Sequence, residues 1–279
     1  MAVRIVTDSS CDLVEEEARR HGVEVVPLSI RFGEAEFEDR TELSVDAFYD
    51  KLAASDVLPE TAAPAPGKFE AAFRRQAEAG ADAVVCINLS AGLSATMQSA
   101  QNAAVAIADE LPVRVLDSTS ITSGLGTQVV LAAQAAADGA SVDEVVALVE
   151  GLARRTRVFG ALDTLDNLKK GGRIGGAQAL LGSLLSIKPI LDLSSGVVEE
   201  AGKARTRKKA LEVLRDKVAA AGAVEHLKIT HGFAPDVEDM LGLLGSVHPR
   251  EQIEVGTIGP VIGTHGGPRV MGVTWLDPA

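Results

Sequence analysis

The chain has 279 residues, of which 46% are hydrophobic and 24% charged, and its formal net charge at pH 7 is −12. The negative charge disfavours nucleic acid and anionic membranes as partners, and seven phenylalanines, one tyrosine and one tryptophan are too few for a base-stacking surface. No apolar run approaches the roughly 18 residues of a membrane span, and no secretory signal is recognisable. We therefore expect a cytoplasmic protein without membrane anchoring.

The first half of the chain alternates between strand and helix patterns. Strands are predicted at 2–6, 23–30, 83–89 and 113–116, and helices at 12–20, 44–55, 69–79, 94–109, 128–137 and 141–154. Asp12 with Glu15 and Ser141 with Glu144 have the spacing of N-terminal capping pairs. Such alternation is typical of a mostly parallel sheet with helices on both faces.

The second half differs in its pattern. Strands are predicted at 159–162, 190–193, 197–201, 227–230, 252–257 and 269–275, and helices at 208–220 and 236–244. The turn Ser194-Ser195-Gly196 predicts a hairpin, and hence some antiparallel pairing. We expect an α/β protein of two α/β domains: an N-terminal one over residues 1–155 and a smaller C-terminal one with a mixed sheet over residues 156–279.

Hydroxyl-rich loops follow three predicted strands, at 7–10, 90–96 and 117–124. The carboxyl ends of parallel strands share one edge of a sheet, where open α/β sheets bind ligands. Ordinary helix capping explains one such loop more readily than three. Thr61 lies in a proline-containing segment that we expect to be a loop, so its hydroxyl could join the same site.

Ser94 has two possible roles. Gly92-Leu93-Ser94-Ala95-Thr96 nearly matches the G-x-S-x-G nucleophile elbow, and His265 follows in the order expected of a serine hydrolase or acyltransferase. However, the fifth position is Thr96 and no acidic third member stands out. Alternatively, Ser94 is a hydrogen-bond donor at a helix start, where carboxylate or phosphate binds readily.

His265 lies within Gly259-Pro260-Val261-Ile262-Gly263-Thr264-His265-Gly266-Gly267-Pro268. Glycine and proline at this density indicate tight turns that let another group approach the backbone. We interpret His265 as presented to a ligand, with Thr61 and Ser94 completing a three-point clamp. A capped turn that holds a polar residue by chance is the alternative.

No nucleotide-binding motif is recognisable, because the glycine-rich stretch 169–176 matches neither G-x-G-x-x-G nor a P-loop. The two cysteines, Cys11 and Cys86, cannot form a four-ligand zinc site. We expect no cofactor and no metal. We also expect both thiols to be reduced and Cys86 to pack in the core. The stretch 179–187 is apolar on nearly every side. It could pack in the core or form a wall for a long apolar ligand.

The charge is unevenly distributed. Residues 1–60 carry 15 acidic and 6 basic side chains, whereas residues 169–217 carry 11 basic and 5 acidic ones. A solvated helix face would account for this, but the excess also suggests a surface for an anionic ligand group or an acidic partner. Its candidate residues are Lys169, Lys170, Arg173, Arg205 and Arg207.

Taken together, these segments resemble the DegV family, the bacterial fatty-acid-binding proteins that include the FakB subunits of fatty acid kinase. The matching segments run from end to end: 7–10, Thr61 with Pro64, 89–100, 117–124, 162–173, 202–206 and 259–268. Ala62, Ala63 and Gly266 depart from the family's pattern.

The resemblance implies two α/β domains with one long-chain fatty acid in a tunnel between them. It implies that Thr61, Ser94 and His265 hold the carboxylate, and that a separate ATP-dependent kinase phosphorylates it to an acyl-phosphate. The chain itself would then be a carrier without catalytic residues, and basic residues such as Arg173, Lys170, Arg205 and Arg207 would face the kinase.

Overall fold

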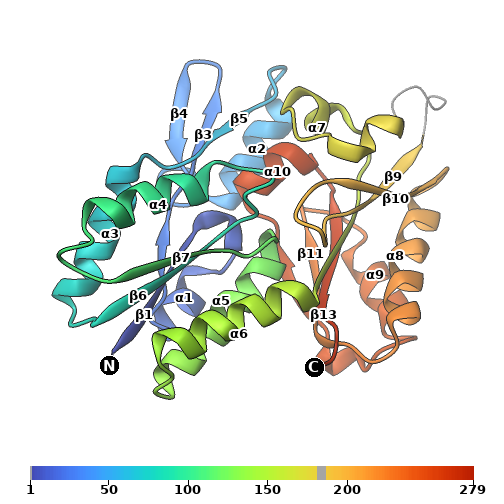
Figure 1. Ribbon diagram of the computed structural model, residues 1–279. Helices are drawn as coiled ribbons and strands as arrows, with labels where there is room; N and C mark the ends of the chain where they lie inside the picture. Colours follow the sequence, from blue (N-terminus) through green and yellow to red (C-terminus); the bar gives the residue numbers. More distant parts are fainter. Residues whose placement is uncertain (1, 181–186) are drawn as a thin grey trace.

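The computed structural model describes residues 2–180 and 187–279. A four-stranded parallel sheet forms the centre of the first half, in the order β2-β1-β6-β7 (Figure 1). Its strands are β1 (Val3–Asp8), β2 (Glu24–Val26), β6 (Ala83–Asn88) and β7 (Val113–Asp117). The helices around it are α1 (Glu15–Arg20), α3 (Pro66–Glu78), α4 (Thr96–Ala106), α5 (Thr122–Ala137) and α6 (Val142–Arg155).

Alternation along the buried strands explains why helices cover both faces of this sheet. In β6, Val84 and Cys86 pack with residues of α3 and α4, whereas Val85 and Ile87 pack with residues of α5 and α6. Successive side chains of a strand point to opposite faces, so a strand with apolar residues on both faces needs a cover on each side. Cys86 is a core residue, as predicted, and Cys11 is also buried.

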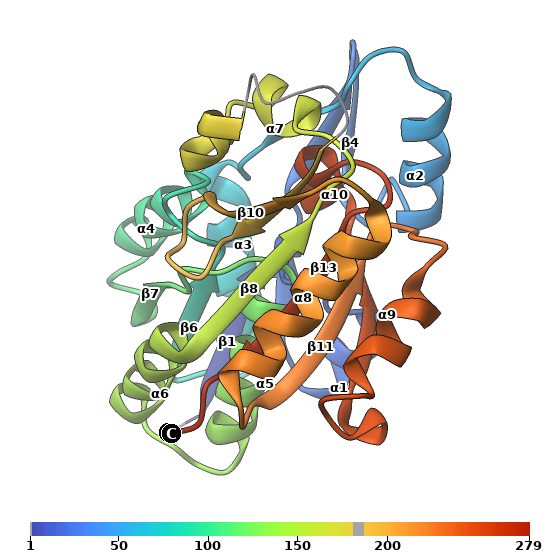
Figure 2. The same cartoon turned by 90° about the vertical axis from the view of Figure 1, so that its right-hand side faces the viewer.

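A six-stranded mixed sheet forms the second half, in the order β10-β9-β8-β13-β11-β12. Its strands are β8 (Thr156–Ala161), β9 (Lys188–Asp192), β10 (Glu199–Ala204), β11 (Glu225–His231), β12 (Glu254–Thr257) and β13 (Met271–Leu276). Only the β11–β12 pair is parallel among the described pairs of this sheet. Helices α8 (Arg207–Ala221) and α9 (Val237–Leu244) cover one face, which is turned to the viewer in Figure 2.

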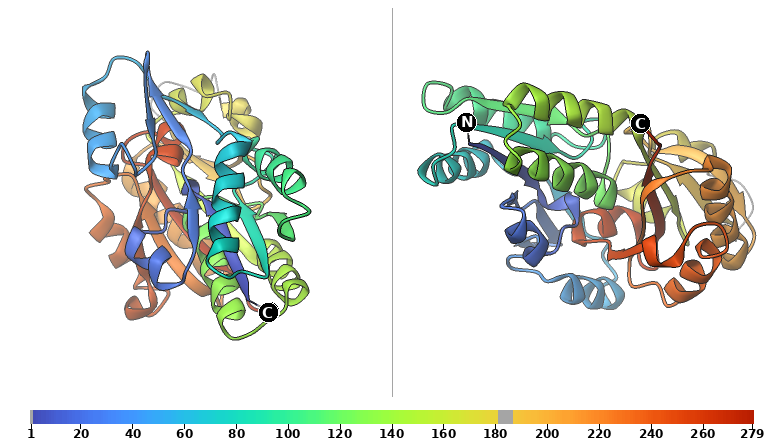
Figure 3. Two further views of the ribbon diagram at one scale, coloured as in Figure 1. Left: turned by 90° about the vertical axis from the view of Figure 1, so that its left-hand side faces the viewer. Right: turned by 90° about the horizontal axis from the view of Figure 1, so that it is seen from below.

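A small antiparallel sheet, β4-β3-β5, is built from β3 (Ser29–Phe32), β4 (Ala35–Glu38) and β5 (Glu60–Ala62). It packs with α2 (Val45–Ala54) and, from the other end of the chain, α10 (Pro260–Gly266). The remaining elements are α7 (Asp166–Lys170) and the 3-10 turns Ser9–Cys11, Gly175–Leu180 and Arg250–Gln252. Seen from below, the two larger sheets lie side by side (Figure 3). The α/β class, with one parallel and one mixed sheet, is as predicted.

Several local predictions were wrong. The strand expected at 23–30 is two strands in different sheets, because Pro27 interrupts it and lacks the N–H that a ladder needs. Asp12 does not cap α1, whose N-cap is Val14 without a side-chain hydrogen bond. Thr61 lies in β5 rather than in a loop, and α5 begins at Thr122 instead of 128. The predicted capping box of Ser141 and Glu144 is confirmed.

Candidate functional site

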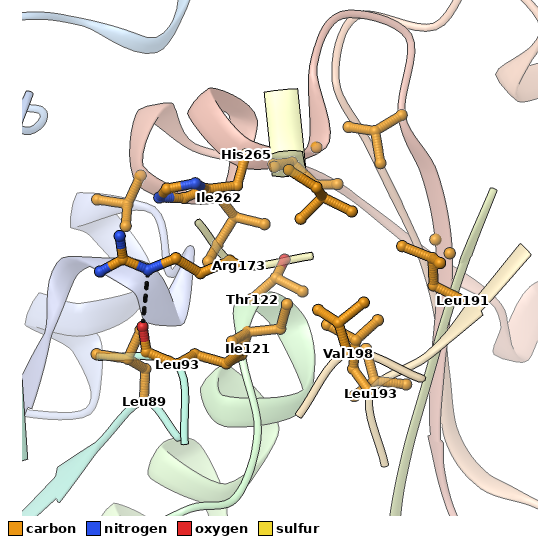
Figure 4. A pocket seen from close by; sticks show the side chains of 18 of the residues that line it. Leu89, Leu93, Ile121, Thr122, Arg173, Leu191, Leu193, Val198, Ile262 and His265 are labelled. Carbon is orange, nitrogen blue, oxygen red and sulfur yellow. Dashed lines mark hydrogen bonds between the residues drawn. The ribbon is translucent and has the colours of Figure 1, made fainter. Parts of the chain in front are cut away.

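One mainly apolar pocket lies where the parallel sheet, the mixed sheet and α10 meet, and it contains Thr61, Ser94 and His265 in its lining (Figure 4). It encloses about 840 Å³ of space free of protein atoms, the open mouth included. Much of its wall is aliphatic and comes from distant parts of the chain, including Leu89, Ile121, Leu162, Leu191, Val198 and Ile262.

Thr61 and His265 meet in this pocket although they are 204 residues apart in the sequence. Thr61 Oγ1 and His265 Nε2 lie 2.9 Å apart. Burial, together with the positive charge of Arg173, lowers the pKa of His265 to about 4. The imidazole is therefore neutral near pH 7, and it can donate or accept one hydrogen bond at each ring nitrogen according to its tautomer.

Ser94 lies just before the first turn of α4. Its Oγ is 2.9 Å from Thr96 Oγ1 and accepts a hydrogen bond from the backbone N–H of Thr96 at 3.3 Å. The N-terminal N–H groups and dipole of a helix favour an anion at such a position. Ser94 is thus a polar group at an anion-compatible end of α4, at the helix start that the sequence predicted.

Arg173 also lines the pocket, on the same side as His265 in Figure 4. Its Nε donates to the carbonyl of Leu93 at 3.1 Å, and its Nη1 donates to the carbonyl of Gly171 at 2.7 Å. These bonds hold a cation against the loop that carries Ser94. A fixed positive charge beside neutral hydroxyl and imidazole groups makes this end of the pocket suitable for a carboxylate.

His265 belongs to a short helix, and not to the turn that its glycine-rich surroundings suggested. Residues far away in the sequence hold this helix. Asp12 Oδ1 accepts from the backbone N–H of Gly259 at 3.0 Å and from Arg40 Nη2 at 2.8 Å, and Tyr49 donates to the carbonyl of Ile258 at 3.0 Å. We refer to Asp12, Arg40 and Tyr49 as the α10 clamp.

At the other end of α10, Asn167 Nδ2 donates to the carbonyl of Thr264 at 3.0 Å. Next to it, Gly171 faces the imidazole so closely that a Cβ there would collide with His265 Nδ1. Sequence reasoning did not find the α10 clamp or this contact. Asp12 and Gly171 were visible only as a supposed cap and as part of a glycine-rich stretch.

The three hydroxyl-rich loops do not all reach the pocket. Ser94 of the second loop and Ile121 and Thr122 of the third line it, but no residue of the first loop does. In the first loop, Asp8 accepts hydrogen bonds from the side chains of Ser10 and Asn88 and from the backbone of Ser10 and Leu89. The first loop therefore ties β1 to β6 and is structural.

The geometry gives no support to a nucleophile elbow at Ser94. Ser94 Oγ is paired with Thr96, and His265 Nε2 is paired with Thr61. Within 2–180 and 187–279, no aspartate or glutamate lines the pocket, and His265 Nδ1 is buried without a hydrogen-bond partner. The relay from serine through histidine to carboxylate that activates a serine nucleophile is absent from the described residues.

The candidate partner residues fall into different environments. Lys170 and Arg205 are exposed. Arg207 is not free for a partner, because it makes two hydrogen bonds to Asp236, of 2.8 and 3.0 Å, and its side chain is only 13% exposed. Arg173 forms part of the pocket wall. The expected apolar wall at 179–187 falls mostly on residues 181–186, which lie outside the described part of the chain.

None of the helices in the described residues is long and apolar enough to cross a membrane.

Comparison with known proteins identifies the family. The family model described as "Uncharacterised protein, DegV family" matches residues 2–277. A DegV domain-containing protein from Streptomyces coelicolor is 40% identical over 277 residues, which cover 97% of each chain. Among solved structures, a DegV family protein from Thermus thermophilus, described as binding fatty acid, is 36% identical with a TM-score of 0.89 over 100% of both chains.

A stearic-acid-binding protein from Eubacterium ventriosum is also similar, at 26% identity and a TM-score of 0.86, with 99% of this chain and 98% of that one covered. The matches in sequence and in structure thus extend over nearly the whole chain. The chain belongs to the DegV family.

Proposed function

We propose that this protein binds one long-chain fatty acid in the pocket between its parallel and mixed sheets. The carboxylate lies beside Thr61, Ser94, His265 and Arg173, and the acyl chain runs along the aliphatic wall. The observation that carries the proposal is the polarity of the pocket. The Thr61 hydroxyl lies beside the His265 imidazole, and the Arg173 guanidinium is bonded to the carbonyl of Leu93, next to Ser94. The rest of the lining is mainly apolar.

The energetics favour a ligand with one charged end and a long apolar tail. Each buried methylene contributes about 0.8 kcal/mol, so a tail of some 15 methylenes contributes on the order of 10 kcal/mol before the costs of association. A carboxylate buried without partners would cancel much of that gain. Arg173 supplies the charge, and the hydroxyls of Thr61 and Ser94 supply hydrogen-bond donors.

Two further facts support the proposal. The Thermus thermophilus and Eubacterium ventriosum relatives are described as fatty-acid-binding proteins. In addition, the described pocket holds no arrangement that would activate a nucleophile. We therefore assign this chain the role of a carrier, not of an enzyme.

The carrier role includes a partner. We propose that a separate ATP-dependent kinase phosphorylates the bound carboxylate, with the exposed Lys170 and Arg205 contributing to its docking surface. The absence of a nucleotide motif in this sequence supports a separate source of ATP binding. Arg173 belongs to the carboxylate end of the pocket in this proposal, and Arg207 takes no part in docking.

Titration of the purified protein, stripped of lipid, with a fluorescent long-chain fatty acid tests the site. The double variant Ser94→Ala/His265→Ala should bind at least tenfold more weakly, since it removes two of the polar groups at the carboxylate end. Ser195→Ala/His226→Ala is the matched control, because both side chains are exposed and outside the pocket. Equal affinity for the wild type and the Ser94→Ala/His265→Ala protein would refute the site.

A reconstituted acyl-phosphate assay with a bacterial fatty acid kinase tests the partner. Lys170→Glu/Arg205→Glu should lower the rate and leave fatty-acid affinity unchanged, and the effect should shrink as salt rises. Arg19→Glu/Arg20→Glu on α1 makes the same change of charge on exposed residues at the opposite end of the molecule (Figure 1). If both double variants support the kinase equally, Lys170 and Arg205 are not docking residues.

A further inference from the structure

A row of four residues crosses the pocket face of the mixed sheet. Leu191 on β9 is in register with Gly160 on β8, Gly160 with Gly272 on β13, and Gly272 with Thr230 on β11. All four line the pocket. The row therefore has side chains at its two ends and two glycines in the middle, so that backbone forms a shallow trough in the wall between Leu191 and Thr230.

The position of Gly160 within β8 shows which way this trough opens. Val158, two residues before Gly160, and Leu162, two residues after it, both line the pocket. Phe159 also borders the pocket, but it packs in the core cluster under α8 and α9. Side chains two apart share a face of a strand. A side chain at residue 160 would therefore point into the pocket.

The steric requirement for glycine differs between positions 160 and 272. A Cβ on Gly272 would lie 2.9 Å from Thr230 Cγ2 and 3.3 Å from the carbonyl oxygen of Phe159, so local packing requires the small residue. A Cβ on Gly160 would meet no atom closer than Leu162 Cδ1 at 3.8 Å, which is ordinary contact. Gly160 also lies outside the left-handed region of backbone conformations. Neither packing nor backbone geometry explains a glycine at 160.

Glycine within a strand carries a cost, because it loses more conformational freedom on folding and has no side chain to pack. What it provides at residue 160 is empty space in the pocket wall. In Figure 4, Leu191, at one end of the row, lies across the pocket from His265 and Arg173. The end of the trough at Leu191 therefore lies across the pocket from the carboxylate end.

We propose that Gly160 is a specificity-determining residue that sets the length of acyl chain the pocket accepts. The inference rests on the proposed function, since the trough matters only if an acyl chain occupies the pocket. The distal part of a long chain lies in the trough against the backbone of β8 and β13. A short chain ends before reaching it.

The test is a series of binding titrations with saturated fatty acids of 12, 14, 16 and 18 carbons, on the wild type and on Gly160→Ala, Gly160→Val and Gly160→Leu. Each larger side chain should exclude more of the distal chain. Each methylene kept out of the pocket lowers affinity about fourfold. Gly160→Leu should therefore bind the 18-carbon acid at least tenfold more weakly than the wild type and the 12-carbon acid nearly as well.

Two controls separate the role of the trough from damage to the fold. Gly151→Ala, in the interior of α6 with open space around it, should leave the length preference unchanged and raise the melting temperature, because alanine is a better helix former than glycine. Gly272→Ala should lower the melting temperature, because its Cβ meets Thr230. Gly160→Ala should leave the melting temperature unchanged or raise it.

The results distinguish this inference from the proposed function. If the wild type binds none of the acids, fatty-acid binding itself is refuted. If the wild type binds them but the Gly160 variants show the same length preference, or lose all lengths equally, Gly160 does not set the length. A shift toward shorter acids that grows from Ala to Val to Leu is the result that the proposal requires.

Discussion

The α10 clamp gives a sharp prediction for Arg40→Met. Asp12 is buried, with its side chain 2% exposed, and the Arg40 side chain is 22% exposed. Arg40 also donates to the carbonyl of Leu13 at 2.9 Å. Replacing Arg40 by methionine keeps the aliphatic stem and removes every donor. The carboxylate of Asp12 then keeps the backbone N–H of Gly259 but has no counter-charge.

An unpaired buried charge left by removal of one partner costs about 3–5 kcal/mol. Arg40→Met should lower the free energy of unfolding by that amount. The double variant Asp12→Asn/Arg40→Met should recover part of the loss, because asparagine has no charge and its carbonyl oxygen can still accept from Gly259. Contacting residues of this kind show coupling energies of about 0.5–3 kcal/mol.

Urea unfolding at pH 7, followed by the fluorescence of the single tryptophan, Trp275, measures these differences. Trp275 is buried in the mixed sheet. Titration with a fluorescent fatty acid under native conditions shows whether the position of His265 has changed. If Arg40→Met is within 1 kcal/mol of the wild type, or if the second substitution adds to the loss, Asp12 and Arg40 do not act as a buried ion pair.

Two further predictions concern a buried acid and a buried contact. Burial raises the pKa of Asp39 from 3.8 to about 7. Between about pH 4 and 7 the native state therefore keeps a proton that the unfolded state has lost. As pH rises through this window, the contribution of Asp39 lowers the free energy of unfolding. Asp39→Asn should therefore gain stability over the wild type, by up to about 4 kcal/mol between pH 4 and 7 and no more above it, in urea unfolding across pH; a flat difference would exclude an Asp39 pKa near 7. Gly171→Ala should fold, because φ at this residue is −71°, but it should bind fatty acid more weakly, because the new Cβ would lie 2.8 Å from His265 Cε1 and closer still to Nδ1. Fatty-acid titration checks this beside the control Gly67→Ala, whose Cβ meets nothing within 4 Å. Equal affinities of the two variants would contradict the prediction.

Regular elements could be predicted from the sequence where their own periodicity decides the structure. β6 is buried at every position and apolar up to its last residue, Asn88, because both faces are covered, and α6 carries a complete capping box. Elements set by distant partners could not be predicted. β5 has only three residues and exists because it pairs with β3, and α10 is a helix in a segment whose glycines favour turns.

In the candidate site, too, residues with a local sequence signal could be predicted, and those whose role depends on distant partners could not. Thr61, Ser94 and His265 could be proposed because each is a polar residue in an unusual local context, and all three line one pocket. Asp12 looked like a local cap because Glu15 follows it three residues later, yet its partners are Arg40 and Gly259. Arg173 looked like part of a basic surface, since charge counting does not show that its guanidinium turns back to Leu93.

Native mass spectrometry of the protein purified from a bacterial host tests the central claim most directly. The wild type should carry one long-chain fatty acid per chain, released on denaturation and identified by lipid extraction. The Ser94→Ala/His265→Ala variant, folded by its circular dichroism, should lose it, whereas Ser195→Ala/His226→Ala should keep it. A wild type that shows only the mass of the polypeptide, even after incubation with fatty acid, would contradict the account.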